Sequence, residues 1–212
     1  TIDRLHLFFE VVSPEVVRVA ELFIISNPEN KVVVASEEGQ PVLNIPVPEG
    51  ATNLQFQDGV LGGRYVETAD GFGDTRGIYP GAGQYQLLFS VDLPYDRKLD
   101  LRQALPLPVN EVVVVLPDVG LKLKGDNFTA QGTRDLQGTP YQVFSGMGFT
   151  AGSDLSLSLS GRLTSTGLTT TPGSQTELAV GLGALALVLI VAGVWLYRRP
   201  RTNQGEEEAF AF

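Results

Sequence analysis

An uninterrupted apolar run, LAVGLGALALVLIVAGVWLY at residues 178–197, most constrains what this 212-residue chain can fold into. None of its residues is charged. A helix of this length is about 30 Å long, which matches the hydrocarbon core of a bilayer. A signal peptide would stand at the N-terminus and have a shorter apolar core. The run therefore predicts one C-terminal transmembrane α-helix at residues 178–197, surrounded by the lipid bilayer.

Basic and aromatic residues stand at the C-terminal end of this run. The residues expected at the membrane interface are Trp195, Tyr197, Arg198, Arg199 and Arg201. Arginines beside a span favour the cytoplasmic side, and aromatic rings settle at the level of the lipid headgroups. We therefore expect a single-pass protein of the cell membrane, with a short cytoplasmic tail at residues 198–212. The N-terminal domain would be extracytoplasmic, and we expect an export signal to have preceded Thr1.

Small residues within the run predict contact with a second helix. The candidate helix-packing residues are Ala179, Gly183, Ala192 and Gly193. Small residues four apart allow two helices to approach closely, although glycine and alanine are common in spans regardless. The run contains no ionisable residue, which argues against ion translocation by this helix. We expect other membrane protein subunits as partners.

Composition excludes several classes of function. Cysteine is absent and His6 is the single histidine, so disulfides, thiolate zinc sites, iron–sulfur clusters and blue-copper centres are ruled out. The formal net charge is −9, which makes nucleic acid an improbable partner because phosphate binding requires basic surface. An exported domain without cysteine is typical of a bacterial envelope protein. We expect no cofactor.

Residues 1–163 alternate apolar and polar side chains with the period of β-strands. Gln84–Leu93 places five apolar residues on one face, and Asp154–Leu163 alternates leucine with serine. Asn110–Leu116 is apolar on both faces, which indicates a central strand. About ten short, turn-bounded strands predict an all-β extracytoplasmic domain, an antiparallel β-sandwich of Ig-like or jelly-roll-like type.

Four further segments give more local predictions. Lys31–Ser36 is predicted as a short strand, and Pro41–Pro48, with its three prolines, as an edge strand or linker. Asp96–Leu105 could form one short helix capped by Asp96. Residues 164–177 are rich in Thr, Ser and Gly and are predicted as a stalk between the β-domain and the span.

The glycine-rich stretch at residues 70–77 (DGFGDTRG) is a weak candidate for a metal site. Asp70 and Asp74, with backbone carbonyls, could hold Ca²⁺, which prefers oxygen ligands. Glycine and aspartate also dominate ordinary turns, and we favour that interpretation. His6 alternates with leucines and is expected on the more solvated face of its strand. The sequence predicts no catalytic residue and no enzyme.

Four segments together resemble a loosely defined group of bacterial exported proteins: VVRVAELFIISNPENKVVV, PVLNIPVPEGATNLQF, GQYQLLFSVDLPY and PVNEVVVVLPDVGLKL. In that group a carboxypeptidase-regulatory-like, Ig-type module precedes a second β-domain and a C-terminal membrane anchor. The resemblance is one of pattern and covers most of residues 5–160. It implies a non-enzymatic β-domain and transfers no site residues.

Three hypotheses for function follow. The first is a structural or accessory subunit of a larger membrane complex, such as an energy-converting, photosynthetic or transport assembly. The second is a stand-alone surface module that binds carbohydrate, peptide or Ca²⁺, which an exposed aromatic patch would favour: Tyr65, Phe72, Tyr79 and Tyr85. The third and least favoured is an envelope hydrolase, which would require a buried pair of carboxylates in a cleft.

Overall fold

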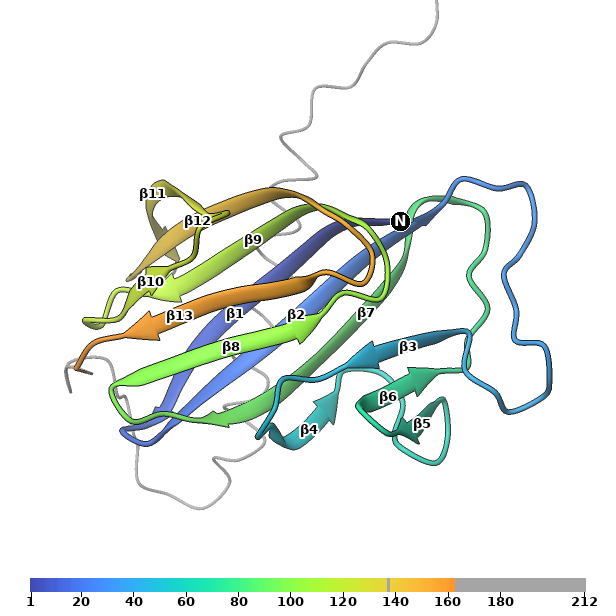
Figure 1. The fold of residues 1–212 in the computed structure, drawn as a ribbon, viewed down its shortest axis with the longest axis horizontal. Coiled ribbons are helices and arrows are strands. Elements are labelled where there is room, and N and C mark those ends of the chain that lie inside the picture. The colour runs from blue at the N-terminus through green and yellow to red at the C-terminus, as the bar shows by residue number, and fades with distance from the viewer. Residues whose placement is uncertain (137, 163–212) are drawn as a thin grey trace, which may run out of the picture.

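The computed structural model describes residues 1–136 and 138–162, which form an all-β structure (Figure 1). The strands are β1 (Ile2–Ser13), β2 (Val16–Asn27), β3 (Leu43–Pro46), β4 (Thr52–Phe56), β5 (Tyr65–Thr68), β6 (Gly71–Asp74), β7 (Gly81–Pro94), β8 (Lys98–Ala104), β9 (Val109–Pro117), β10 (Lys122–Lys124), β11 (Thr129–Leu136), β12 (Thr139–Phe149) and β13 (Asp154–Ser160). The all-β prediction is confirmed, while the choice between Ig-like and jelly-roll-like types stays a prediction.

The predicted stalk, span and tail lie outside the described residues. The same holds for every residue proposed there for helix packing or for the membrane interface: Ala179, Gly183, Ala192, Gly193, Trp195, Tyr197, Arg198, Arg199 and Arg201. Over the residues that the structure does describe, no helix has the length and apolar character needed to cross a bilayer.

Three sheets build the fold. The large sheet has seven strands in the order β11-β12-β9-β1-β2-β7-β4, and its neighbours are antiparallel except for the parallel pair β1 and β9. Two three-stranded antiparallel sheets have the orders β10-β13-β8 and β3-β6-β5, and we call them the β8 sheet and the β6 sheet. Both contribute to one apolar core with the large sheet, as in a β-sandwich.

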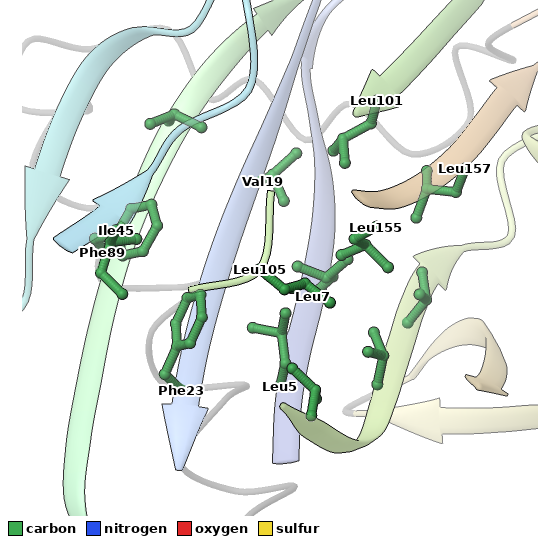
Figure 2. Close-up of a cluster of buried hydrophobic side chains, with 14 of the residues drawn as sticks. Leu5, Leu7, Val19, Phe23, Ile45, Phe89, Leu101, Leu105, Leu155 and Leu157 are labelled. Carbon is green, nitrogen blue, oxygen red and sulfur yellow. The ribbon is translucent and has the colours of Figure 1, made fainter. Parts of the chain in front are cut away.

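The core lies between the large sheet and the two smaller sheets (Figure 2). Alternation explains which side chains enter it, because successive residues of a strand point to opposite faces. Leu5 and Leu7 of β1 meet Leu155 and Leu157 of β13 across the layers, and Leu101 of β8 packs in the same cluster. The one-sided patterns predicted for Gln84–Leu93 and Asp154–Leu163 therefore correspond to the core faces of β7 and β13.

Two local predictions are confirmed. The strand predicted at Asn110–Leu116 is β9, which lies inside the large sheet between β12 and β1. The segment Pro41–Pro48 contains β3, an edge strand of the β6 sheet. Proline is tolerated there because an edge strand can lose a backbone donor without breaking the sheet.

Two other local predictions are wrong. Instead of a helix, Asp96–Leu105 contains β8, whose residues pair with β13 from Lys98 to Ala104. The alternation of core-facing Leu99 and Leu101 with exposed neighbours suits a strand, and pairing with β13 outweighs the local capping signal. The valines of Lys31–Ser36 form only an isolated bridge, between Val33 and Ile78.

The outer face of the large sheet carries a second apolar cluster: Phe8, Ala20, Leu22, Leu88 and Val115. His6 points to this face, opposite Leu5 and Leu7 as predicted, but it is only 5% exposed, so the expectation that it is solvated there is wrong. Its ring stacks on the ring of Phe8, with 5.8 Å between the centroids. Burial, helped by the nearby charge of Arg4, lowers the pKa of His6 to about 4.

Candidate binding surface

The exposed apolar side chains are unevenly distributed. Among the described residues, the large hydrophobic side chains that face solvent are Val32, Val33, Val34, Val60, Leu61, Tyr79 and Met147. All but Met147 belong to three loops that adjoin strands of the β6 sheet: β2–β3 (residues 28–42), β4–β5 (57–64) and β6–β7 (75–80). Scattered exposed aliphatics are ordinary, whereas a cluster of them marks an interaction site.

Backbone hydrogen bonds join two of these loops. The N–H of Val33 donates to the carbonyl oxygen of Ile78 at 3.0 Å, and the N–H of Ile78 returns a bond to Val33 at 2.9 Å. The buried side chain of Asn27 donates from Nδ2 to the carbonyl oxygens of Lys31 and Ile78, at 2.8 and 3.0 Å. The loop geometry is therefore held by main-chain bonds and a buried amide.

This pairing places three apolar side chains, those of Val32, Val34 and Tyr79, on one face of the two loops. In an antiparallel bridge between Val33 and Ile78, Tyr79 stands opposite Val32. Gly77 stands opposite Val34, and a Cβ atom there would lie 3.3 Å from Val32 Cγ1 and 3.5 Å from Val34 Cγ1. Val34 and Tyr79 are 67% and 66% exposed. We call Val32, Val34 and Tyr79 the valine patch.

The β2–β3 loop, which carries Val32 and Val34, is acidic. Glu29, Glu37 and Glu38 are exposed there, against one lysine, Lys31. On the β6–β7 loop, the guanidinium of Arg76 donates to the carbonyl oxygen of Gln86 and lies 4.3 Å from the ring centroid of Tyr85. The valine patch therefore belongs to two loops in which acidic side chains outnumber basic ones.

The valine patch and the last described residues lie at opposite ends of the large sheet (Figure 1). The β2–β3 loop follows the end of β2, and the β6–β7 loop precedes the start of β7. Gly161 is bound at the other end, where its N–H donates to the carbonyl oxygen of Arg97 and its own carbonyl accepts from the Tyr95 hydroxyl. A twelve-residue strand such as β2 separates the two ends by about 40 Å.

The third loop, β4–β5, is attached to the β6 sheet through Arg64. Its Nε and Nη2 atoms donate to the fully buried carboxylate of Asp74, at 3.0 and 2.5 Å. Its Nη1 donates to the exposed carboxylate of Asp58 at 2.7 Å. The hydroxyl of Tyr85 and the backbone N–H of Arg76 also donate to Asp74. These contacts orient the loop that exposes Val60 and Leu61.

Asp74 is ionised in this network. Burial alone raises the pKa of its carboxyl, but the hydrogen bonds from Arg64, Tyr85 and the Arg76 N–H outweigh burial and hold the pKa below its usual value. Burial and the bond to Asp74 raise the pKa of Tyr85 well above its usual value. Both effects favour one state, a neutral tyrosine bound to a carboxylate.

The candidate Ca²⁺ pair is not brought together. Asp74 is at the end of β6, where its oxygens accept from Arg64, Tyr85 and Arg76. Asp70 is in the turn before β6, four residues away, which is about 13 Å along an extended strand. Within residues 1–136 and 138–162 there is no group of three or more His, Asp or Glu side chains suited to a metal ion.

The aromatic residues proposed as a binding patch are mostly buried. Tyr65, Phe72 and Tyr85 are at most 4% exposed, and only Tyr79 faces solvent. The Phe72 ring packs edge-on against Tyr65 and against Phe89 of the large sheet, with centroids 5.5 and 4.9 Å apart. These rings therefore attach the β6 sheet to the large sheet.

The fully buried carboxylates of the described residues do not form a pair of the kind a hydrolase uses. Asp74 is bound to Arg64, and Glu21, on the core face of β2, is bound to the amide of Gln103. The sequence patterns did not identify Glu21, Gln103 or Arg64 as site residues. Glu21 could have been identified from the sequence, because it is an acidic residue that interrupts the apolar residues at the core-facing positions of β2.

The chain matches no known family model, and no curated protein sequence matches it either.

Proposed function

We propose that this chain is a non-catalytic, single-pass membrane protein that acts as an accessory subunit of a larger membrane complex. Its acidic β-domain lies on the extracytoplasmic side, and the valine patch docks a partner subunit. The observation that carries the proposal is the position of this patch at the end of the domain opposite Gly161, after which the chain continues toward the apolar run at residues 178–197.

The geometry of the patch supports a docking role. Its loops are held by paired backbone bonds between Val33 and Ile78, so little conformational entropy is lost when a partner binds. An apolar centre with a polar rim is the usual anatomy of a protein interface. The exposed acidic side chains of the β2–β3 loop, Glu29, Glu37 and Glu38, fit a partner whose apolar surface is bordered by Lys or Arg.

The test is extraction of native membranes in mild detergent, followed by a native gel and mass spectrometry of the band that contains the full chain. We expect co-migration with multi-span proteins in fixed stoichiometry. Migration of the wild-type chain alone, or as a homodimer, would contradict the accessory-subunit proposal.

A double variant with Val32→Ser and Val34→Ser tests the surface itself. We expect it to lower co-migration about tenfold or more, because exposed apolar anchors carry most of the affinity of an interface. The matched control is Met147→Ser, since Met147 is 77% exposed on β12, outside the patch. Equal loss of co-migration in both variants would show that the valine patch is not the docking surface.

A stand-alone binding module is the second candidate, favoured by the exposed ring of Tyr79 beside the valines. In that case the ligand is an apolar peptide. The wild-type chain would then migrate without multi-span partners, and the Val32→Ser, Val34→Ser variant would lose binding in a screen against immobilised peptides.

A further inference from the structure

A carboxylic acid lies in the middle of the apolar core. Glu21 occupies a core-facing position of β2, between Leu7 of β1 and Phe89 of β7 in the register of the large sheet. Its exposed fraction is 0%. The other core-facing residues of the strand include Val19 and Phe23. A polar group in such a place requires hydrogen-bonding partners.

Its partner joins three sheets. Nε2 of Gln103, a residue of β8, donates to Glu21 Oε2 at 3.0 Å and to the carbonyl oxygen of Pro46 in β3 at 2.7 Å. Gln103 is 3% exposed. β8 and β3 are edge strands of two separate sheets, so the layer facing the large sheet has a seam between them. Across this seam, no other hydrogen bond between the two sheets is found in the described part of the chain.

Two oxygens in this arrangement lack partners. Glu21 Oε1 and Gln103 Oε1 are both buried without a hydrogen bond. Both hydrogens of the Gln103 amide are already used, by Glu21 and by Pro46. A carboxylate and an amide oxygen can only accept, whereas a protonated carboxyl supplies one O–H donor. The addition of one proton therefore gives both oxygens a partner.

Among the residues that the structure describes, no charged group stabilises an ionised Glu21. The groups that face it are Leu7 of β1, Phe89 of β7, the Gln103 amide of β8 and the Pro46 carbonyl of β3, and none of them ionises. Burial raises the pKa of Glu21 to about 8, although the bond from Gln103 acts in the opposite direction.

We propose that Glu21 is protonated at neutral pH and forms a two-bond ring with Gln103, a proton-dependent latch that holds the β6 sheet against the β8 sheet. The carboxyl O–H donates to Gln103 Oε1, while Gln103 Nε2 donates to Glu21 Oε2. Release of this proton to solvent removes the hydrogen bond from Glu21 to Gln103 Oε1. It leaves in the core a carboxylate without a counter-charge, which keeps only the hydrogen bond from Gln103 Nε2. β3 and β8 then separate before the rest of the fold opens, because Gln103 supplies the hydrogen bond between them.

The direction of the pH effect follows from linkage. An unfolded chain releases the Glu21 proton near the ordinary pKa of 4.5, whereas the folded chain keeps it until about pH 8. Between these values the folded state binds more protons, so the contribution of Glu21 to stability is fully present below pH 4.5 and declines as the pH rises to about 8.

The first test is infrared spectroscopy of the full chain in mild detergent, as a titration that follows the C=O stretch of protonated carboxylic acids. We expect one such band to persist at pH 7 in the wild-type chain and to be missing in Glu21→Gln. Glutamine preserves the ring, because its amide N–H replaces the carboxyl O–H. If the wild-type chain shows no protonated acid at pH 7, the proposal fails whether or not the variant folds.

The second test is hydrogen exchange read by mass spectrometry, with wild type and Glu21→Gln compared at equal pH near 6 and near 9.5. Above the pKa we expect exchange in peptides of β3 and β6 to be about tenfold faster in wild type than in the variant. Peptides of β13 should differ much less. Equal protection of the two chains in β3 and β6 at high pH would overturn the latch.

Discussion

The two small sheets that face the large sheet are held to it by different interactions. The β8 sheet is held by the burial of regularly spaced leucines. These leucines stand two residues apart on its core side: Leu99, Leu101, Leu155, Leu157 and Leu159. Its ion pairs, Lys98–Asp100 and Arg102–Asp154, lie on the solvent side. The β6 sheet has four-residue strands and is attached by a few rings and one buried ion-pair network around Asp74.

The two small sheets therefore differ in how many contacts share the free energy that holds each of them to the large sheet. Leucine burial is non-directional and divided among many contacts, so no single leucine decides the position of the β8 sheet. In the β6 sheet, the carboxylate of Asp74 accepts from Arg64, Tyr85 and Arg76, and a directional network loses several bonds at once. The β6 sheet should therefore be far more sensitive to one polar substitution.

Asp74→Asn should have the largest effect. It leaves the guanidinium of Arg64, whose side chain is 15% exposed, without its buried counter-charge. Breaking a buried ion pair lowers the free energy of unfolding by about 3–5 kcal/mol. Urea unfolding of the full chain, followed by circular dichroism, measures this loss.

Asp58→Asn is the matched control, because Asp58 binds the same guanidinium but its side chain is 73% exposed. We expect a loss below about 1 kcal/mol for this exposed pair. If the two variants were equally stable, the β6 sheet would not depend on its buried network.

Leu157→Ala should have the next largest effect, a loss of about 3 kcal/mol from removed apolar contacts and the cavity left behind. Leu157 is 4% exposed and belongs to the core cluster between the sheets. Ser156→Ala on the solvent side of the same strand should change the free energy of unfolding by less than about 0.5 kcal/mol. A larger loss for Leu157→Ala than for Asp74→Asn in the same urea experiment would reverse the comparison.

Arg102→Ala should have a much smaller effect than Asp74→Asn or Leu157→Ala. The side chains of Arg102 and Asp154 are 76% and 35% exposed, so solvent screens their attraction. We expect a loss below about 1 kcal/mol, reduced further by salt. A loss comparable to that of Asp74→Asn would mean that charge, and not leucine burial, positions the β8 sheet.

The same difference explains which parts of the fold were predictable. Alternation in Asp154–Leu163 predicted β13, because each leucine there needs only an apolar layer opposite it. Residues 70–77 lack such a pattern and were interpreted as a loop with a possible metal site. A Cβ at Gly71 would lie 2.3 Å from the Ile45 carbonyl oxygen, so glycine at this position of β6 allows the close approach of β3.

The functional residues were harder to predict than the strands. Val32–Val34 was predicted as a strand, but its exposure depends on pairing with Ile78, a residue distant in the sequence. The acid at Glu21 is visible in the sequence, whereas its partner Gln103 follows it by 82 residues. Neighbouring residues in the sequence do not indicate either pairing, because each joins segments that are far apart in the chain.

The sequence by itself determined the all-β character of residues 1–162 and the core faces of the long strands, because apolar alternation is a property of neighbouring residues. It also carries the apolar run at residues 178–197, from which the membrane span is predicted. Only the tertiary structure decided that Asp74 binds Arg64, that Glu21 binds Gln103 at a seam, and that three valines stay exposed. These contacts join side chains from different strands and loops. Their burial and hydrogen bonds depend on how those segments pack together, which no single segment of the sequence specifies.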